Sequence, residues 1–229
     1  MSKAPSSREV ILADVRAALV AHASSPLQPL PASARFEPRK AAALGEEMEM
    51  MLREVKRLSG HGLLVRGREA FAAALDRLIR AEGIRTAAFN DHPFYHPYGI
   101  AGLLKGFGVR IVSPDGDGRG LAECDLGITV ADAAIPETGS VLLRTTQGQS
   151  NLLSLLPRVH LALVIPETFL ADLHQTFTLA KGDRHFVLVS GSSRTADIEK
   201  ILTLGVHGPK SFHVWICEGE EKTVHGDRP

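Results

Sequence analysis

Polar side chains that could take part in chemistry are concentrated in four short segments, and the first of these is residues 129–140. Asp132 and Glu137 lie there between two apolar runs, and two carboxyl groups could position a substrate hydroxyl or exchange a proton if one has a raised pKa. Thr138 and Ser140 add hydroxyls, and Gly139 would let a ligand approach the backbone closely. The alternative is a polar connection in which these groups bond only the local backbone.

A second segment, residues 189–199, places a loop of Gly and Ser between a predicted strand and a predicted helix. Backbone N–H groups at such a helix start suit an anion, and Arg194 could hold a phosphate or carboxylate with two hydrogen bonds. The neighbours that would help to bind this anion are Ser192, Ser193 and Thr195. Two acidic residues of the predicted first turn argue for a purely structural loop, because they already complement the helix dipole and would repel an anion.

The third segment, residues 90–98, contains one aspartate and the histidines His92 and His96, which zinc would accept as ligands. Pro93 and Pro97 disrupt the helical spacing that would bring the histidines together, and no further ligand follows at a motif spacing. We therefore predict no metal site here and expect an aromatic loop that closes over a pocket.

The fourth segment, residues 205–209, carries His207 in a turn with glycine and proline. His207 could act as an acid or base or as a pH-sensitive hydrogen-bond partner. A histidine satisfied within the structure is the alternative interpretation.

The charge balance excludes several classes of partner. The chain has 229 residues, and its 26 Lys and Arg are matched by 26 Asp and Glu. Binding to nucleic acids or to membrane surfaces usually shows as excess basic charge, so we expect neither. No apolar stretch reaches the roughly 18 to 20 residues that span a bilayer, and charged residues interrupt the N-terminal region where a signal peptide would have its apolar core. These features predict a cytoplasmic protein.

The cysteine content excludes further classes. Only Cys124 and Cys217 are present, so a disulfide framework is not expected and a metal site made of cysteines alone is impossible. An iron–sulfur cluster normally takes four thiolates, so this chain has no such cofactor of its own. The chain also lacks the glycine-rich motifs of nicotinamide-cofactor and ATP sites.

Residues 1–60 are predicted to form a helical arm. Ser6 and Glu9 have the spacing of a capping box, which predicts a helix over residues 7–22. A proline-rich linker follows, and an apolar stripe predicts a second helix over residues 39–58 that stops at Gly60. This arm is expected to pack on the main domain or on a second subunit.

Residues 61–229 have the pattern of an α/β domain in which short strands alternate with amphipathic helices. Strands are predicted at residues 63–66, 86–89, 109–113, 126–130, 141–144, 159–165, 186–189 and 212–217, and helices at 68–81, 98–106, 167–179 and 195–204. This alternation predicts a mostly parallel, open, Rossmann-like sheet flanked by helices. Ligands of such sheets bind at the carboxyl ends of the strands, where the four polar segments would meet.

The polar segments also carry a family resemblance. Residues 125–140, beginning Asp125-Leu126-Gly127, resemble the signature of the LUD domain, and residues 154–160, 193–199 and 204–209 follow in the order of that family. The resemblance implies a fold like that of ribose-5-phosphate isomerases, glucosamine-6-phosphate deaminases and CoA transferases. It also implies a role in oxidising L-lactate to pyruvate beside two partner proteins, at least one of which carries iron–sulfur clusters.

Three functions remain open at this point. The leading one is an accessory subunit of a lactate-oxidising system, with a pocket in which Arg194 binds a carboxylate or phosphate and Glu137 or His207 handles a proton near Asp132. The second is a stand-alone enzyme or binding protein for a sugar phosphate or an acyl-CoA, and the third is a scaffolding or regulatory protein. The N-terminal arm could serve as a docking element or form an oligomer.

Overall fold

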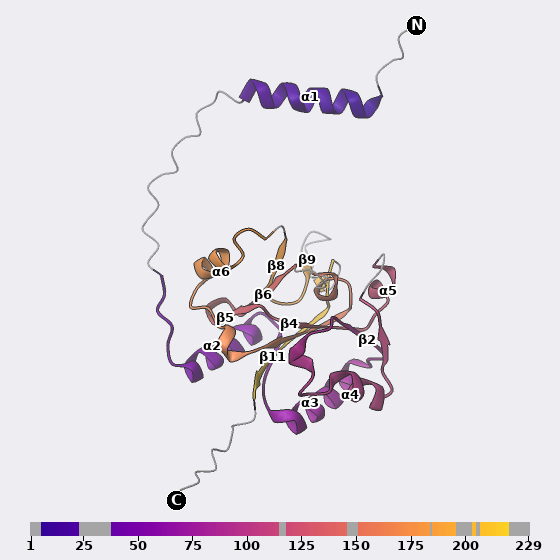
Figure 1. The fold of residues 1–229 in the computed structure, drawn as a ribbon, viewed down its shortest axis with the longest axis vertical. Coiled ribbons are helices and arrows are strands. Elements are labelled where there is room, and N and C mark those ends of the chain that lie inside the picture. The colour runs from indigo at the N-terminus through magenta and orange to yellow at the C-terminus, as the bar shows by residue number, and fades with distance from the viewer. Residues whose placement is uncertain are drawn as a thin grey trace, which may run out of the picture. The chain divides into compact units, whose positions relative to one another are not determined.

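The computed structural model describes residues 6–22, 38–114, 118–145, 151–183, 185–195, 203–204 and 207–219 (Figure 1). The chain divides into two compact units, residues 1–37 and residues 38–229, which are described separately. Within these described ranges no helix combines the length and the apolar character needed to cross a bilayer.

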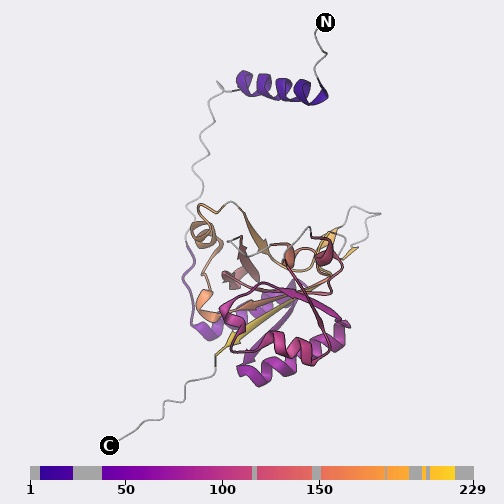
Figure 2. The same ribbon diagram turned by 45° about the vertical axis from the view of Figure 1, so that its right-hand side comes forward.

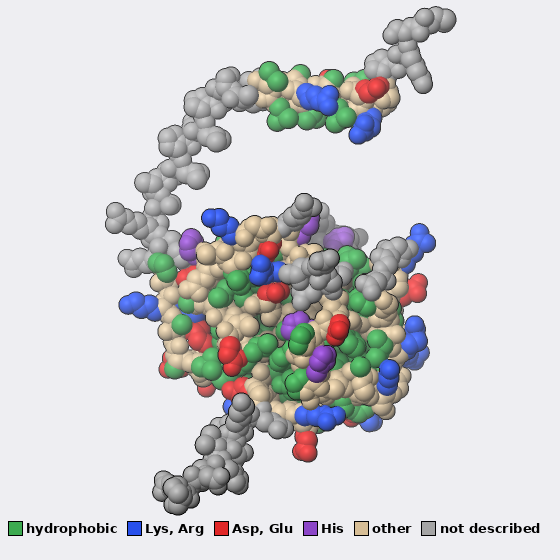
Figure 3. All heavy atoms as spheres, in the orientation of Figure 1, with side chains coloured by type: hydrophobic (Ala, Val, Ile, Leu, Met, Phe, Trp, Pro, Cys, Tyr) green, Lys and Arg blue, Asp and Glu red, His purple; other side chains and the backbone are tan. Residues whose placement is uncertain are grey.

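The first unit contains the predicted N-terminal helix, α1, at Ser7–His22. The capping box is confirmed: the Ser6 backbone N–H and hydroxyl both donate to the Glu9 carboxylate, at 2.7 and 2.9 Å, and the Glu9 N–H donates to Ser6 Oγ at 3.4 Å. The helix exposes a row of apolar side chains (Figure 3) that includes Ile11, Val15 and Leu19.

The second unit is built on a six-stranded parallel sheet, in the order β1-β11-β7-β4-β2-β3. The strands are β1 His61–Arg66, β2 Thr86–Phe89, β3 Arg110–Val112, β4 Leu126–Val130, β7 Val159–Val164 and β11 Ser211–Glu218. The two central strands β4 and β7 are buried along their whole length, as expected when both faces of a parallel sheet are covered. The predicted fold class, a mostly parallel α/β sheet flanked by helices, is confirmed.

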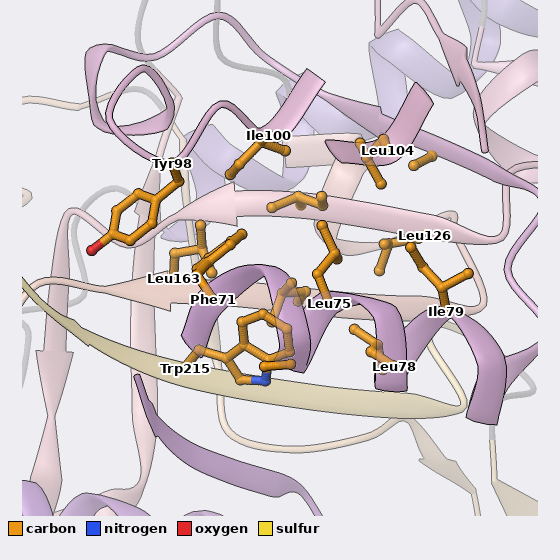
Figure 4. Close-up of a cluster of buried hydrophobic side chains, with 14 of the residues drawn as sticks. Phe71, Leu75, Leu78, Ile79, Tyr98, Ile100, Leu104, Leu126, Leu163 and Trp215 are labelled. Carbon is orange, nitrogen blue, oxygen red and sulfur yellow. The ribbon is translucent and has the colours of Figure 1, made fainter. Parts of the chain in front are cut away.

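One face of this sheet is covered by α3 Gly67–Glu82 and α4 Ile100–Gly106 (Figure 2). Phe71 and Leu75 of α3 are fully buried against side chains of the sheet such as Trp215 (Figure 4). Phe71 meets the Trp215 ring edge-on, with centroids 5.3 Å apart. Gly83 ends α3 in the left-handed conformation, where glycine carries no steric penalty.

The opposite face is covered by α2 Leu44–Arg57 and by a small antiparallel sheet in the order β5-β6-β8. Its strands are β5 Ala133–Ile135, β6 Ser140–Arg144 and β8 Phe186–Val189. Met51 and Val55 of α2 are buried against Val214 and its neighbours on the sheet. Helix α2, which the sequence placed in the arm, thus contributes to the core of the unit that begins at Pro38.

Short helical segments complete this second face. They are α5 Arg119–Ala122 and the 3-10 turns η2 Pro136–Thr138, η3 Asn151–Ser154 and η4 Pro166–Thr168, with the helix α6 Leu173–Leu179. The 3-10 turn η1 Pro93–Tyr95 instead packs on the first face, where Tyr95 belongs to the same cluster as Phe71. The η3 turn packs so closely on β4 that a Cβ on Gly127 would overlap the carbonyl oxygen of Leu153. Gly127 therefore lets two backbone segments lie in contact.

Several predicted elements differ from the structure. Helix α2 begins at Leu44 rather than near residue 39, because Arg39 instead donates hydrogen bonds to Glu47 at 2.8 and 2.7 Å and to the Ala171 carbonyl at 2.6 Å. Its last turn ends with Ser59, not Gly60, in a positive-φ conformation.

The predicted helix over residues 167–179 is wrong in its first part, which is the η4 turn followed by an extended segment before α6. The predicted helix over residues 195–204 is wrong at the two ends that the structure describes. Its described ends are strands, because β9 Arg194–Thr195 pairs with β10 Thr203–Leu204, and residues 196–202 lie outside the described part of the chain. The strand β5 and the helix α5 were not predicted; both are too short to show a clear periodicity.

Candidate functional site

A crevice opens where the direction of the chain connections reverses in the parallel sheet. Strand β2 has β3 on one side and β4 on the other. The chain leaves β2 towards α4 on one face, and it leaves β4 towards β5 and β6 on the opposite face. Loops that diverge at such a switch point leave a gap at the carboxyl ends of the strands, which is where open α/β sheets bind ligands.

The crevice at this switch point is narrow, and most of the residues that line it have polar side chains. Its enclosed volume is about 20 Å³, enough for one water-sized group. It is lined by Asn90, His92, Tyr95, Thr129, Val130, Leu143, Arg144 and Asn151. These residues come from the loop after β2, the end of β4, the end of β6 and the start of η3.

The loop after β2 forms one wall. The His92 ring caps η1, because its Nδ1 accepts a hydrogen bond from the Phe94 N–H at 3.1 Å. Tyr95 is buried, its hydroxyl donates to the Ile128 carbonyl at 3.3 Å, and burial raises the pKa of its phenol. This segment was predicted to be an aromatic loop over a pocket, and its residues do line the crevice. Among the described residues there is no group of three or more His, Cys, Asp or Glu that could hold a metal ion.

Asp132 follows β4 and lies beside this crevice. Its Oδ2 accepts a hydrogen bond from the Arg144 backbone N–H at 2.8 Å. Burial raises the pKa of Asp132, although that hydrogen bond and the charge of Arg144 act in the opposite direction. A carboxyl with a raised pKa at the end of a central strand suits proton transfer, the chemistry expected for this residue.

Arg144 brings a positive charge to the wall of the crevice. Its Nε and Nη2 donate to the Asp183 carboxylate at 2.5 and 3.0 Å, which holds the pKa of Asp183 below its usual value. The guanidinium is thus fixed in position by a bidentate pair.

Thr129 connects the crevice to a buried histidine on β7. Its Oγ1 lies 2.8 Å from His160 Nε2, and both side chains are buried. Burial lowers the pKa of His160 to about 3, so its ring is neutral at physiological pH. This pair was not predicted; the signals were a histidine in an apolar strand and a threonine on the neighbouring one.

The predicted hydroxyl residues lie at the other end of the small sheet. Thr138 donates to Ser140 Oγ at 2.8 Å, and Ser140 Oγ lies 2.6 Å from Ser190 Oγ. Ser140 pairs with Ile135, whereas Asp132 precedes the pair Ala133–Leu142. The end of the small sheet near Asp132 and the end at Ser140 are about 10 Å apart along β6, at about 3.4 Å per residue. The structure therefore does not bring Thr138 and Ser140 into one site with Asp132.

Glu137 and Gly139 lie beside α2. Glu137 is half exposed, and its Oε2 is 3.9 Å from Arg39 Nε. Gly139 has φ +62°, and a Cβ at this position would meet the Val55 nitrogen at 2.8 Å. Gly139 thus permits the close approach of helix α2, and not of the ligand that we expected.

The Gly/Ser loop after β8 also packs on α2. The Arg194 guanidinium donates through Nη2 to the carbonyl of Leu58, so its partner is a helix end instead of an anion. The Ser193 N–H donates to the Pro209 carbonyl at 3.0 Å, next to the exposed His207.

Two other predicted binding residues stand near this loop. Ser192 is half-buried in it, and Thr195 belongs to β9, although its side chain lies outside the described part of the chain. Because Arg194–Thr195 is a strand, the predicted helix does not begin at Thr195, where its N-terminus was expected to bind an anion.

Polar residues that line the crevice were not among the predicted binding residues. Asn90, Arg144 and Asn151 are the clearest of these. Asn90 is the first residue after β2 and Arg144 is the last of β6. Their sequence signal was therefore their position at a predicted strand end.

The sheet order and the crevice define a doubly wound α/β protein with a candidate ligand site at the carboxyl edge of its sheet. A crystal structure of a DUF162 family protein from Deinococcus radiodurans has the same fold, with a TM-score of 0.59 and 19% identity, covering 78% of this chain and 100% of that one. The LUD domain family matches residues 48–217, and the chain belongs to this family.

Its curated relatives are more similar in sequence. Lactate utilization protein C of Shouchella clausii (strain KSM-K16) is 30% identical over 149 residues, which are 59% of this chain and 64% of that protein. Lactate utilization protein C 1 of Bacillus mycoides (strain KBAB4) is 29% identical over 180 residues, 72% of this chain and 74% of that protein. The chain thus spans slightly less than two thirds of the Shouchella clausii protein.

Proposed function

We propose that this protein acts in lactate utilization, as an accessory subunit of a system that oxidises L-lactate to pyruvate. The observation that carries the proposal is the match of the LUD domain to residues 48–217, together with relatives named Lactate utilization protein C. In this proposal the chain has no iron–sulfur cluster of its own and works beside partner proteins that carry clusters.

The cysteines support this division of labour. The sequence holds only Cys124 and Cys217, whereas a cluster normally takes four thiolates. Both side chains are buried, and burial raises the pKa of each thiol, that of Cys217 to about 12. A buried thiol that keeps its proton is a poor metal ligand. Electrons taken from lactate would therefore pass to clusters in the partners.

The crevice supports a subunit that binds a small molecule over one that serves only as a scaffold. Perturbed titratable groups in a concave site are typical of functional sites, and the pKa of Asp132 is raised by burial beside the crevice. A surface that served stability alone would have no need of this arrangement.

The helix α1 supports an interaction with another subunit. Within the first unit its apolar residues Ile11, Val15 and Leu19 are exposed, at 62%, 49% and 66% of their full surface. Apolar rows of this kind are commonly buried in an interface. We expect that removing residues 1–32 weakens assembly with the partners while residues 38–229 still fold, as circular dichroism would report.

Growth on L-lactate as the sole carbon source tests the proposal. A strain lacking the gene should fail to grow on L-lactate, grow normally on a sugar, and recover with the full-length chain. The tagged chain, purified from lactate-grown cells, should bring with it proteins that contain iron and labile sulfide. Normal growth of the deletion strain on lactate would contradict the proposal, and a thermal shift with sugar phosphates or CoA esters alone would favour an independent enzyme or binding protein.

A further inference from the structure

The floor of the crevice holds a buried acceptor that lacks a hydrogen bond. Asn90 directly follows β2 and is only 9% exposed, and its Oδ1 has no hydrogen-bonding partner among the residues that the structure describes. Unpaired buried polar atoms are uncommon because each has lost its hydration without replacement. Since Asn90 lines the crevice, a group that donates a hydrogen bond from within the crevice would satisfy it.

Thr129 supplies a donor in the same crevice. His160 is neutral and completely buried, and its Nδ1 likewise has no partner in the described part of the chain. A buried N–H without an acceptor is rarer than a lone pair without a donor, which favours the tautomer with the proton on Nε2. That N–H donates to Thr129 Oγ1, 2.8 Å away, and leaves the Thr129 hydroxyl hydrogen for a partner in the crevice.

The walls add a second donor and a positive charge. His92 accepts a hydrogen bond at Nδ1, so its neutral ring carries a proton on Nε2 and can donate it. Arg144 is held by Asp183 through Nε and Nη2, and this residue also forms part of the wall. The crevice therefore combines one buried acceptor with donors that suit a carboxylate.

We propose that this crevice binds a small 2-hydroxycarboxylate, whose hydroxyl donates to Asn90 Oδ1 and whose carboxylate accepts from Thr129 beside Arg144. The enclosed volume of about 20 Å³ accommodates the hydroxyl, and the carboxylate and the remaining carbons lie in the wider part of the crevice. The inference rests on the proposed function, since it gives the subunit itself a site for the hydroxy acid. A site with an unpaired acceptor should discriminate against a 2-oxo acid, which has no hydroxyl hydrogen to donate.

Calorimetric titration of the purified full-length chain with sodium L-lactate, pyruvate and propionate tests the proposal. Propionate has the same carbon chain as lactate without the hydroxyl, and pyruvate replaces the hydroxyl with a carbonyl. The wild-type chain should bind L-lactate at least tenfold more tightly than either of the other acids. Equal affinity for the three acids, or no binding of lactate, would overturn the proposal.

Two variants locate the interaction. Asn90→Leu has nearly the same size but no acceptor, so it should lose the preference for lactate while its weaker affinity for propionate stays unchanged. Thr129→Val should weaken the binding of all three acids about equally, because it removes the donor to the carboxylate. Gln175→Leu removes an exposed amide on α6 whose Oε1 accepts from the Ala171 N–H outside the crevice; it is the control for loss of an amide elsewhere and should bind as the wild type does. A lactate preference that survives in Asn90→Leu would overturn the assignment, and the wild-type ligand series remains decisive even where a variant does not fold.

The titration tests the site and the growth experiment tests the proposed function, so one can fail without the other. If the chain is required for growth on lactate but does not bind lactate, the site is wrong and the proposed function stands. If the chain binds lactate with the expected preference but is dispensable for growth, the site stands and the function is wrong.

Discussion

Replacing Gly127 with alanine is expected to destabilise the protein and to disturb the crevice. Gly127 lies in the buried strand β4, and a Cβ there would overlap the Leu153 carbonyl oxygen and lie 2.9 Å from Pro157 Cγ. Leu153 belongs to η3, the turn that begins with Asn151 in the crevice wall. The added methyl group can be accommodated only if this turn moves away from the sheet.

The magnitude follows from two opposing effects. Overpacking of a well-packed core typically costs about 1–3 kcal/mol, and overlap with backbone belongs at the upper end of this range. Alanine recovers roughly 0.5–1 kcal/mol, because glycine loses more conformational entropy on folding. The expected net loss is about 2 kcal/mol, which lowers the melting temperature by roughly 4–8 °C for a chain of this size.

Thermal and urea unfolding followed by circular dichroism measure this loss. The matched control is Gly102→Ala, in the interior of α4, where a Cβ would meet no atom within 4 Å. That substitution should raise stability by about 1 kcal/mol through helix propensity alone. If Gly127→Ala melts within 2 °C of the wild type, close packing of η3 on β4 is not what requires a glycine, and the reasoning fails.

Three further predictions concern the second face of the sheet. Gly139→Ala should cost about 3 kcal/mol, from the left-handed conformation and the approach to Val55, and urea unfolding would measure it. Glu47→Gln should cost about 2 kcal/mol at pH 7 by weakening the pair with Arg39. Because that hydrogen bond lowers the pKa of Glu47, the difference in free energy of unfolding between variant and wild type should shrink as the pH falls below 4.5. An unchanged difference at pH 3 would refute this. Burial lowers the pKa of His160 to about 3, so below pH 6.5 the unfolded chain binds a proton that the folded chain does not. The free energy of unfolding should therefore decrease as the pH is lowered from 6.5 to 3, by up to about 1.36 kcal/mol per pH unit. In His160→Gln the free energy of unfolding should depend less steeply on pH over this range, as urea unfolding would measure.

Much of the secondary structure could be predicted from the sequence because it depends on near neighbours in the chain. The helix from Ser7 to His22 begins where its capping box predicts, and the strands at Thr86–Phe89 and Leu126–Val130 have the predicted bounds. Alternating strands and helices were enough to predict a mostly parallel sheet. The sequence by itself also determined that too few cysteines are present for a cluster.

The candidate site depended on contacts between distant parts of the chain. The sequence could not show that β6 and β8 leave the main sheet for a small antiparallel one, because their apolar patterns resemble those of the other strands. That pairing separates Asp132 from the hydroxyl of Ser140. Likewise, Gly139 and Arg194 could each contact a ligand or a helix, as far as their residue types show. Only the tertiary structure shows that both contact α2 or the residue that ends it.

Asn90 shows most clearly why the hydrogen bonding of the site could not be predicted from the sequence. Its position after a predicted strand placed it at the carboxyl edge of the sheet, and that much was local. Whether its oxygen is buried, and whether any described neighbour donates to it, depends on the loops and strands that surround it in three dimensions. Periodicity reports which way a side chain faces, whereas hydrogen bonding depends on what the fold places opposite it.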